Sequence, residues 1–600
     1  MATKSFADEH LIINSQNREA TSLNGQWNYI VDQYENGFFN YRLQPFDEQP
    51  NYQHNHGAFY ADYQQQDKTE LIEYNFDYSP TMRIPGSWNA QDEQLFWYEG
   101  SVWFRKKFSY TKKEATNRVF VYFGAVNYEA HVYLNGQKLG THIGGFTPFN
   151  FEVTSWIKEG ENSLVVKVDN KRHKDAVPTV NTDWFNYGGI TRDVKLIETP
   201  GAFISDYQVQ LKKGSLTEVV GYVQLDGSKT AQEVKIEIPE LKISTSTRTN
   251  AEGKATVDFQ LKKANYWSPE NPKTYEVTLT SGDSKVTDFI GFRSIETRGS
   301  ELLLNGKKIF LRGISIHEEN GSRGDRAYSQ EDAETLLGRA KALNCNFVRL
   351  AHYPHNEYMI KTAEKMGILV WSEIPVYWTI DWENAATFAN AQNQLRSMIN
   401  RDKNRANVII WSVANETPVS EPRTTFLTNL IATAREMDDA RLISAALEKH
   451  NLSDDPVVVS IEDPFAKYVD VLSFNQYIGW YDGLPEKCNR ATWQIKFEKP
   501  VIISEFGGGA LYGFHADKET RWSEEFQEDL YVQNLKMLEK IPQLSGMTPW
   551  ILSDFRSPRR MLARIQDGYN RKGVFSETGE KKKAFYVLRD YYLKKEVQFK

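Results

Sequence analysis

The stretch Asn346–Ile374, with the sequence NFVRLAHYPHNEYMIKTAEKMGILVWSEI, shows the unit from which the second half of the chain is built. It begins and ends with short apolar runs, Asn346–His352 and Ile368–Ile374, which are typical of strands. The residues between them have a helical pattern that ends at Met366, with Gly367 as its expected C-terminal cap. A strand, a helix and a second strand in this order predict a parallel pair joined by a crossover helix.

The same alternation of strand and helix continues along the chain after Gly299. Several of the runs are almost continuously apolar, as expected of parallel strands that are buried on both faces. Between the first two, Ser329-Gln-Glu-Asp332 predicts a helix start with a variant capping box. This pattern predicts a (β/α)8 barrel over residues 297–600. Its predicted strands are Lys308–Ser315, Asn346–His352, Ile368–Ile374, Val408–Ala414, Leu442–Leu447, Val471–Tyr477, Val501–Glu505 and Met547–Asp554.

The first half of the chain has a different pattern, with short alternating strands, frequent turn signals and almost no helical periodicity. Residues 1–200 predict a jelly-roll β-sandwich, in which Asn135-Gly136 is a hairpin turn. Residues 201–296 continue as a smaller, Lys- and Thr-rich set of strands, which predicts an immunoglobulin-like β-sandwich acting as a spacer. The predicted fold class is therefore multidomain, β plus α/β: a jelly roll, an immunoglobulin-like sandwich and a C-terminal (β/α)8 TIM barrel.

Composition and charge exclude several classes of protein. Seventy-two Lys and Arg against 79 Asp and Glu leave a net charge of −7, which argues against a nucleic-acid partner or an anionic membrane surface. No apolar run approaches the roughly 18 residues of a membrane-spanning helix. Met1–Glu19 is polar, so we expect a cytoplasmic protein as the chain stands, or a periplasmic or secreted one if a leader was removed. Cys345 and Cys488 cannot form a disulfide framework in a chain of this length. We separately expect the protein to be a homo-oligomer.

Aromatic residues make up 13% of the chain, including 31 Tyr and 15 Trp. Aromatic faces suit sugar rings, but large β-rich cores also contain many aromatic side chains. The composition alone leaves both explanations open.

Two predicted barrel strands end on a carboxylate, at the end of the barrel where active sites of this fold lie. The fourth strand runs to Asn415 and Glu416, and the seventh ends with Glu505. A single glutamate at a strand end is more often a helix cap or an ion-pair partner. Two facing carboxyl groups are what glycoside hydrolysis requires: one protonates the leaving oxygen, and the other attacks the anomeric carbon or activates water.

Longer motifs around these residues resemble glycoside hydrolase family 2. Asp402–Glu416 resembles the acid/base signature of that family, and Asn346–His355 resembles its second barrel signature. Leu134–Phe149, in the predicted jelly roll, is similar to the family's N-terminal sugar-binding domain. The likeness covers about residues 20–600, in the order jelly roll, immunoglobulin-like sandwich, barrel.

This resemblance assigns chemical roles to the strand-end residues. It implies a retaining enzyme in which Glu416 is the acid/base and Glu505 the nucleophile. Asn415 is then the residue that holds the substrate's 2-hydroxyl. Retention requires carboxyl groups about 5 Å apart, whereas a separation near 8 Å would indicate an inverting enzyme.

Within this family, several segments most resemble bacterial β-glucuronidases. In the stretch NQYIGWY, Tyr477 and Tyr481 match residues that face the sugar, with Tyr477 near the nucleophile. Asp183, in a loop of the predicted jelly roll, matches an aspartate that reaches the sugar's distal hydroxyls. His317, after the first strand, matches the family's active-site histidine, and Trp550, on the eighth strand, matches the tryptophan at the pocket floor.

The segment Asn570-Arg-Lys572 is the most specific sign of the substrate class. Uronate-selective members of the family carry Asn-x-Lys just after strand eight, so the resemblance implies that Asn570 and Lys572 bind the C6 carboxylate. A fixed cation distinguishes a hexuronate from a hexose electrostatically. The alternative is an ordinary basic surface, since Lys572 is expected at an exposed rim and the Lys581–Lys583 run is expected to be a solvated helix face.

The chain departs from the family's pattern at one position and in one loop. Gln566 stands where the family has an arginine, so either Arg560 or Arg564 replaces that contact or the contact is absent. After the third strand, Ile374–Glu383 lacks the long insertion that some glucuronidases place over the aglycone side. We therefore expect an open site that admits oligosaccharides, unless another loop such as Lys449–Tyr468 closes the mouth.

We expect neither a metal nor a cofactor. His352 and His355 lie at a strand end and a helix start without the spacing of a metal site, and Gly507–Gly509 lacks the residues of a phosphate loop. The predicted function is a retaining exo-β-glucuronidase acting on terminal β-D-glucuronides, either conjugates or oligosaccharides. The alternatives are a β-galacturonidase or β-galactosidase of the same family and, from a different class, a catalytically silent carbohydrate-binding protein.

Overall fold

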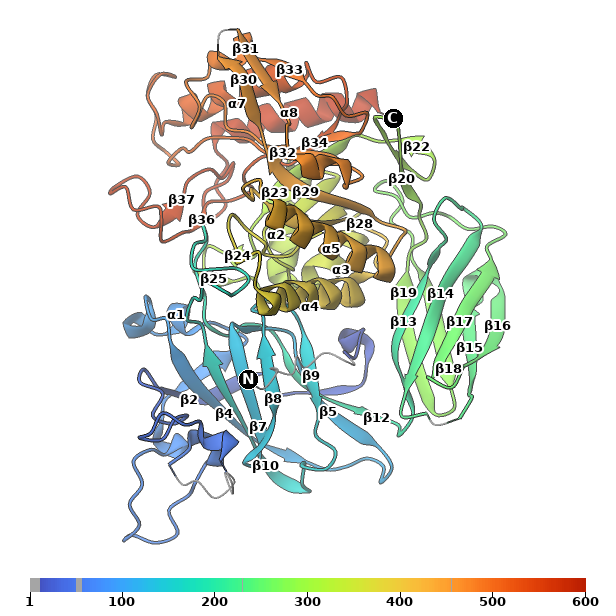
Figure 1. The fold of residues 1–600 in the computed structure, drawn as a ribbon, viewed down its shortest axis with the longest axis vertical. Coiled ribbons are helices and arrows are strands. Elements are labelled where there is room, and N and C mark those ends of the chain that lie inside the picture. The colour runs from blue at the N-terminus through green and yellow to red at the C-terminus, as the bar shows by residue number, and fades with distance from the viewer. Residues whose placement is uncertain (1–10, 50–56, 229, 455, 600) are drawn as a thin grey trace.

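Three β-containing units pack against one another in the computed structural model, which describes residues 11–49, 57–228, 230–454 and 456–599. Figure 1 shows the first unit in blue, the second in green and the barrel in yellow to red. The predicted fold class is confirmed. The first ten residues of the polar stretch Met1–Glu19 lie outside the described residues. Within the described ranges, no helix is both long and apolar enough to cross a membrane.

The first unit is a sandwich of two sheets. Apolar side chains from both sheets, among them Trp27, Phe104 and Val121, fill the space between them. The predicted hairpin is confirmed, since Asn135 and Gly136 both have positive φ (53° and 78°) at the turn. In spatial order, one sheet has β3 (Thr81–Ile84), β2 (Gly25–Val31), β4 (Ser101–Tyr110), β10 (Gly160–Asp169), β7 (Glu129–Leu134) and β8 (Gln137–Ile143), and the other has β1 (Ala20–Ser22), β12 (Val194–Thr199), β5 (Arg118–Phe123) and β9 (Phe149–Glu152).

The second unit is also a sandwich of antiparallel sheets, with Tyr207, Val223, Ile236 and Leu279 in its core. Its alternating buried and exposed positions are those of sheets with one face on the core and one in water. One sheet has β13 (Phe203–Leu211), β14 (Glu218–Asp226) and β17 (Lys254–Gln260), and the other has β16 (Ile243–Arg248), β15 (Glu233–Ile238), β18 (Tyr275–Ser281) and β19 (Ser284–Ile290).

The second unit is fixed to the barrel by part of the motif that ends at Glu416. Lys403 Nζ donates to Asp206 Oδ2 at 2.7 Å, and Asn404 exchanges hydrogen bonds with the backbone of β13. The next residue, Arg405, forms a buried ion pair with Asp288 on β19. This half of the motif therefore attaches the neighbouring unit, and only its other end reaches the mouth of the barrel.

The third unit is a closed barrel of parallel strands, as predicted. All positions of its first four strands are buried, which explains their almost continuously apolar sequences. The strands are β23 (Leu311–Ile316), β26 (Phe347–Leu350), β27 (Leu369–Glu373), β28 (Val408–Asn415), β29 (Leu442–Glu448), β32 (Leu472–Asn475), β34 (Val501–Glu505) and β35 (Leu544–Met547).

Long helices surround the barrel, and their starts follow local capping rules. The predicted capping box is present at the first of them, where the side chains of Ser329 and Asp332 and their backbone N–H groups bond reciprocally. Gly367, with φ 67°, follows the second helix as expected. The long helices are α2 (Gln330–Ala342), α3 (Glu357–Lys365), α4 (Ala385–Asp402), α5 (Glu421–Met437), α7 (Glu524–Leu538) and α8 (Lys583–Gln598).

The predicted position of strand eight is wrong, because β35 ends at Met547 and does not continue to Asp554. Pro549 has no N–H to donate to a ladder. The next three residues donate their backbone N–H groups to three different segments, at the carbonyls of Phe506, Lys572 and Ser315. The apolar run therefore crosses the mouth of the barrel, and Trp550 lies after strand eight. Strands two and six also end early, at Leu350 and Asn475, which leaves His352 and Tyr477 in loops.

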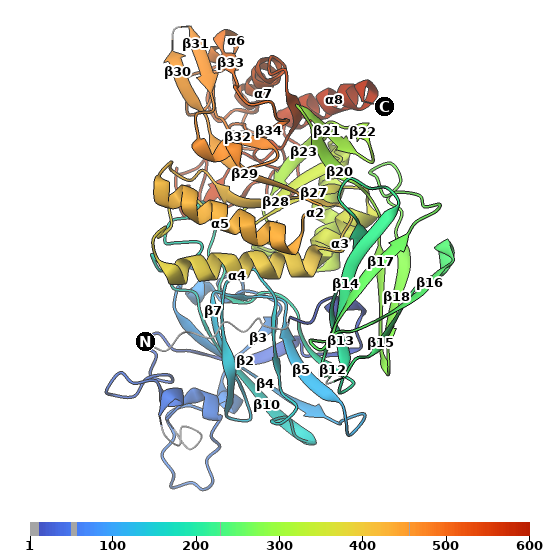
Figure 2. The same ribbon diagram turned by 45° about the vertical axis from the view of Figure 1, so that its right-hand side comes forward.

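Strict alternation of strand and helix stops after β29. The chain there forms a small sheet of β30 (His450–Asp454), β31 (Val457–Ser460) and β33 (Thr492–Gln494), which stands at the top of Figure 2. After β35, a two-stranded ribbon of β36 (Phe555–Arg556) and β37 (Tyr569–Asn570) carries the chain back across the mouth.

Candidate active site

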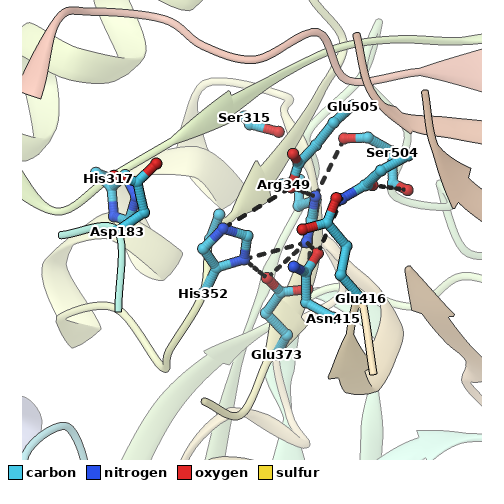
Figure 3. A network of polar contacts seen from close by, with 12 residues as sticks. Asp183, Ser315, His317, Arg349, His352, Glu373, Asn415, Glu416, Ser504 and Glu505 are labelled. Carbon is cyan, nitrogen blue, oxygen red and sulfur yellow. Dashed lines mark hydrogen bonds and ion pairs between the residues drawn. The ribbon is translucent and has the colours of Figure 1, made fainter. Parts of the chain in front are cut away.

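Two glutamates lie at the ends of barrel strands, on either side of Arg349 (Figure 3). Glu505 is the last residue of β34 and is 4% exposed, whereas Glu416 directly follows β28 and is half-buried. Burial raises the pKa of Glu505 to about 8, the Arg349 guanidinium opposes this shift, and the negative charge of Glu416 adds to it. The two carboxylates are therefore close enough for the charge of Glu416 to raise the pKa of Glu505.

Arg349, on β26, is fully buried and holds three side chains of the site. Its Nη1 donates to Glu505 Oε1 at 2.8 Å, and its Nη2 donates to Asn415 Oδ1 at 2.7 Å. Its Nη2 also donates to Oε1 of Glu373, at the end of β27, at 2.9 Å. Burial raises the pKa of Glu373, but Arg349 and His352 outweigh that effect and lower it to about 2. Glu373 is therefore the carboxylate that balances Arg349, and Glu505 shares the same cation.

Each oxygen of the two glutamates has a hydrogen-bond donor. The Tyr477 hydroxyl donates to Glu505 Oε2 at 2.6 Å, and Arg349 donates to its Oε1. For Glu416, the Asn475 amide donates to Oε1 at 3.0 Å and the Trp378 indole N–H donates to Oε2 at 2.9 Å. These donors fix the orientation of both carboxyl groups before any substrate binds.

Two buried nitrogen atoms in the pocket have no partner among the described residues. They are Nδ2 of Asn415 and Nε2 of His317. The other polar atom of each side chain is occupied, Oδ1 of Asn415 by Arg349 and Nδ1 of His317 by the Tyr353 hydroxyl at 3.1 Å. Burial lowers the pKa of His317 well below its usual value, so its ring is neutral. Unpaired buried polar atoms are expected where a ligand supplies the partner.

Asp183 brings the first unit into the mouth of the barrel. It is 6% exposed, and its Oδ2 accepts a hydrogen bond from the Asn570 amide at 3.1 Å. Its Oδ1 accepts from Ser557 Oγ at 2.6 Å and from Arg560 Nε at 3.0 Å. Two residues that the sequence analysis proposed from opposite ends of the chain, Asp183 and Asn570, are thus in direct contact.

Lys572 is not the exposed rim lysine expected from the sequence, since it is only 4% exposed. Its ammonium donates to the Tyr481 hydroxyl at 2.8 Å and lies over the rings of Tyr477, Trp480 and Tyr481. No carboxylate pairs with it within the described part of the chain. Aromatic side chains enclose the stem and leave a cation without a counter-ion at the pocket wall.

A cavity of about 210 Å³ opens beside this ammonium. Arg560 and Gln566 both line it, whereas Arg564 is not among its lining residues. Burial raises the pKa of Tyr481, but the Lys572 and Arg560 cations outweigh that effect and lower it. The cavity is therefore electropositive, and Arg560 is the arginine that stands near the position of Gln566. Its other lining residues are Trp480, Tyr481, Arg521, Trp522, Asn570 and Lys572.

Trp550 forms an aromatic wall beside His317 and His352. It is 4% exposed, stacks on His352 with ring centroids 4.7 Å apart, and meets His317 edge-on at 5.2 Å. Tyr481, in contrast, is 59% exposed at the mouth. The structure thus gathers all ten residues proposed from the sequence around one mouth.

The expectation of a solvated Lys581–Lys583 helix face is wrong at its central residue. Lys582 is fully buried, and its ammonium donates to Asp554 Oδ1 at 2.7 Å and to Oδ2 at 2.9 Å. It also donates to the carbonyl of Arg571 at 3.2 Å. Asp554 in turn accepts the backbone N–H of Gly573 at 2.9 Å. This buried pair therefore holds the backbone on both sides of Lys572.

The nitrogens of His352 and His355 that were considered as metal ligands bond protein groups instead. His352 Nδ1 bonds Glu373 Oε1 at 2.8 Å, and His355 Nε2 bonds the Ala351 carbonyl at 2.9 Å. In the residues that the structure describes, no cluster of three ligating side chains could hold a metal ion. Gly507 has φ 144°, which favours glycine, as the chain turns after Glu505.

Around the two carboxylates, four side chains were not predicted from the sequence: Arg349, Glu373, Trp378 and Asn475. Trp480, Arg521 and Trp522, which line the cavity beside Lys572, were not predicted either. Arg349 and Glu373 had a detectable signal, because a charged residue in a buried apolar strand requires a partner at the strand ends. Asn475 lay in the quoted stretch before Tyr477 and was passed over. For Trp378, the loop sequence carries no signal that distinguishes it from its neighbours.

Glycoside hydrolysis requires two carboxyl groups that act on one glycosidic bond, and TIM barrels carry their active sites at the strand ends where Glu416 and Glu505 lie. The fold and the site are therefore those of a glycoside hydrolase. The chain belongs to the glycosyl hydrolases family 2. Residues 295–595 match the TIM barrel domain of that family, residues 20–200 match its sugar binding domain, and residues 202–293 match its third family model.

Several curated proteins are similar to this chain. A β-glucuronidase from Paenibacillus borealis is 29% identical over 560 residues, covering 85% of this chain and 90% of that one. A β-glucuronidase from Felis catus is 28% identical over 646 residues, covering 97% and 91%. Among solved structures, a β-glucuronidase from an uncultured Clostridium species superimposes with a TM-score of 0.81 at 26% identity, covering 98% of this chain and all of that one.

A second solved structure shows the same fold with a different printed activity. A β-galacturonidase from Eisenbergiella tayi has a TM-score of 0.78 at 24% identity, covering 97% of this chain and 98% of that one. At this identity, the likeness carries the fold alone.

Proposed function

We propose that this glycoside hydrolase is a retaining exo-β-glucuronidase that releases β-linked glucuronate from the ends of its substrates. The observation that carries the proposal is the Lys572 ammonium, buried beside Asn570 without a counter-ion and next to an electropositive cavity. A carboxylate is the ligand that such a site lacks. The β-glucuronidase relatives from Paenibacillus borealis and Felis catus support the same substrate class.

In the first step, Glu505 attacks the anomeric carbon and forms a glycosyl ester. Glu416 gives its proton to the glycosidic oxygen as the carbon–oxygen bond breaks, and the electron pair stays on that oxygen. In the second step, Glu416 takes a proton from water, which displaces Glu505 and restores both groups. The greater burial of Glu505 suits a nucleophile at the floor, and the half-exposed Glu416 faces the side on which the leaving group departs.

Other residues act on charge and orientation. Nδ2 of Asn415 is free to hold the sugar's 2-hydroxyl, because Arg349 occupies its oxygen. Because the pKa of Glu505 is raised to about 8, only part of the free enzyme carries an ionised Glu505 at neutral pH. Arg349 and Tyr477 stabilise this ionised form, which is the one that attacks. Asp183 is assigned to the distal hydroxyls, and the free Nε2 of His317 to another oxygen of the sugar. With these roles, the carboxyl carbons of Glu416 and Glu505 are expected to lie about 5 Å apart.

A β-galacturonidase remains the rival within the family, because a galacturonide presents the same carboxylate and differs in the direction of one hydroxyl. The test is the rate of hydrolysis on 4-nitrophenyl β-glucuronide, β-galacturonide, β-glucoside and β-galactoside. We expect the glucuronide to be hydrolysed fastest. Faster hydrolysis of the galacturonide would reassign the sugar, and no turnover of any substrate would favour a silent carbohydrate-binding protein. ¹H NMR of the first-formed sugar should show the β-anomer.

The decisive variant is Lys572→Met, which keeps most of the buried stem and removes the charge. Loss of one partner of a desolvated charge pair costs about 2–5 kcal/mol, so kcat/KM for the glucuronide should fall roughly 10²–10³-fold. The rate on the neutral glucoside should stay within about twofold, because that sugar has no carboxylate to pair. Equal losses on both sugars would show that the substitution had disturbed the pocket and would contradict the proposal.

A further inference from the structure

Trp378 lies in the short loop after β27 and touches Glu416 directly. Its indole N–H donates to Glu416 Oε2 at 2.9 Å, and its backbone N–H donates to the Asn415 carbonyl at 2.9 Å. The side chain is half-buried, so it stands at the open side of the pocket. No other acceptor takes the indole N–H within the described residues.

Both partners of this contact have an unusual backbone conformation. Trp378 has φ 54° and Glu416 has φ 49°, in the left-handed region that bulky side chains rarely adopt. Such residues persist where the surrounding structure determines their conformation, and they cluster at functional sites. Here the two strained residues are hydrogen-bonded to each other at the mouth of the pocket.

The indole ring is fixed by its neighbours. It packs on Tyr377 with ring centroids 4.5 Å apart, and the guanidinium of Arg559 lies over it at 4.9 Å. The other oxygen of Glu416, Oε1, accepts from the Asn475 amide, whose second N–H reaches the Asn415 oxygen at 3.2 Å. Trp378 is therefore the donor to Oε2 within the described residues.

We propose that Trp378 positions the acid/base Glu416 and directs its proton toward the leaving group. With the indole N–H on Oε2, that oxygen stays an acceptor. Oε1 carries the proton to the glycosidic oxygen, and its hydroxyl oxygen still accepts from the Asn475 amide. When the bond breaks, this proton moves to the departing oxygen and Glu416 becomes a carboxylate with Trp378 still donating to it. The inference rests on the proposed function, in which Glu416 is the acid/base.

The test is the dependence of rate on the leaving group. Trp378→Phe keeps a ring and removes the N–H. Methyl β-glucuronide needs a proton on its leaving oxygen, so its kcat/KM should fall about 10–100-fold, within the range that general acid catalysis contributes. 4-Nitrophenyl β-glucuronide has a good leaving group and should lose less than about threefold. Trp382→Phe, a half-buried tryptophan of the same loop that packs on Phe426, is the control and should change neither rate.

A merely structural role would lower both rates by the same factor, and that result, like no change in either, would overturn the inference. Trp378→His returns a ring N–H and should recover part of the methyl glucuronide rate, provided that its melting temperature matches that of Trp378→Phe. A His variant as slow as the Phe variant would also count against it.

Failure of the underlying function has a separate signature. Glu416→Ala should keep activity on 4-nitrophenyl β-glucuronide only when azide is added, with formation of the β-glucuronosyl azide. Without azide rescue, the acid/base assignment itself fails, whatever Trp378→Phe shows. With azide rescue and equal losses in Trp378→Phe, only the role of Trp378 fails.

Discussion

The carboxylate pair and the Asn570–Lys572 segment lie at the same mouth but are held by different kinds of structure. Glu416 and Glu505 end barrel strands, so the sheet itself sets their positions. Asn570 ends a two-residue ribbon strand, and Lys572 lies in the loop beyond it. Among the described residues, the side-chain partners of Asn570 and Lys572 all lie outside the barrel strands.

Buried charges support the segment instead. Asp183 accepts a hydrogen bond from Asn570, and the Lys582–Asp554 pair binds the backbone on both sides of Lys572. The chemical step and the recognition of the substrate's charge therefore depend on separate parts of the molecule. Changes at the strand ends should affect every substrate, whereas changes around the segment should affect only those that carry a carboxylate.

The largest expected effect is at a strand end. Glu505→Gln removes the nucleophile and should lower kcat by about 10⁴-fold or more, on charged and neutral glycosides alike. Calorimetry with intact 4-nitrophenyl β-glucuronide should still detect binding, because Asn570 and Lys572 are untouched. More than about 1% residual activity would mean that Glu505 is not the nucleophile. The strand ends would then not carry the chemical step for every substrate.

The next largest effect tests whether the Lys582–Asp554 pair supports the Asn570–Lys572 segment. Lys582→Met leaves Asp554 with only the longer contact to Arg571, at 3.3 Å, and frees the Arg571 carbonyl, so the Lys572 ammonium should lose its fixed position. We expect kcat/KM for the glucuronide to fall about tenfold, mostly through KM, with the neutral glucoside changed by less than about threefold. Lys581→Met, an exposed neighbour, is the control and should have no effect. An equal loss on both sugars would show that the pair supports the barrel in general.

The two regions also differ in how far the sequence predicts them. The barrel and its carboxylates follow from periodicity and from the rule that active sites lie at strand ends, so Glu416 and Glu505 could be found before the structure. The burial of Lys582 could not be predicted, because three lysines in a row are usually solvated, and Lys572 was expected at an exposed rim. Burial depends on which distant segment supplies the partner, here Asp554 from the run that was misread as strand eight.

The conformation of Trp378 could not be predicted from the sequence either. A left-handed backbone at tryptophan has no propensity signal, since local preferences disfavour it. The neighbouring carboxylate of Glu416 and the packing of Tyr377 and Arg559 impose it. Sequence reasoning thus found residues that recur at fixed places of the fold and missed the residues that position them.

The smallest expected effect concerns stability, where the two regions should differ in sign. Glu505 is buried at a strand end with its pKa raised to about 8, so at neutral pH the site destabilises the fold. Glu505→Gln should therefore melt at a higher temperature than the wild type at pH 7.5. Lys582→Met should melt lower, because the fully buried Asp554 carboxylate loses its shorter ion pair and keeps only Arg571 at 3.3 Å.

The pH dependence of melting fixes the sign for Glu505. Below about pH 4.5, its carboxyl is protonated in both the folded and the unfolded chain, so Glu505→Gln and the wild type should melt alike apart from a constant offset. Between pH 4.5 and about 8, only the unfolded chain is ionised, so folding takes up a proton and the wild type loses up to about 1.4 kcal/mol per pH unit. Glutamine does not titrate, and the gap between the two melting temperatures should widen by about 1–2 °C per pH unit across this range. Parallel curves would show that the pKa of Glu505 lies in the ordinary range of glutamate. The buried carboxyl group at the strand end would then not lower the stability of the fold.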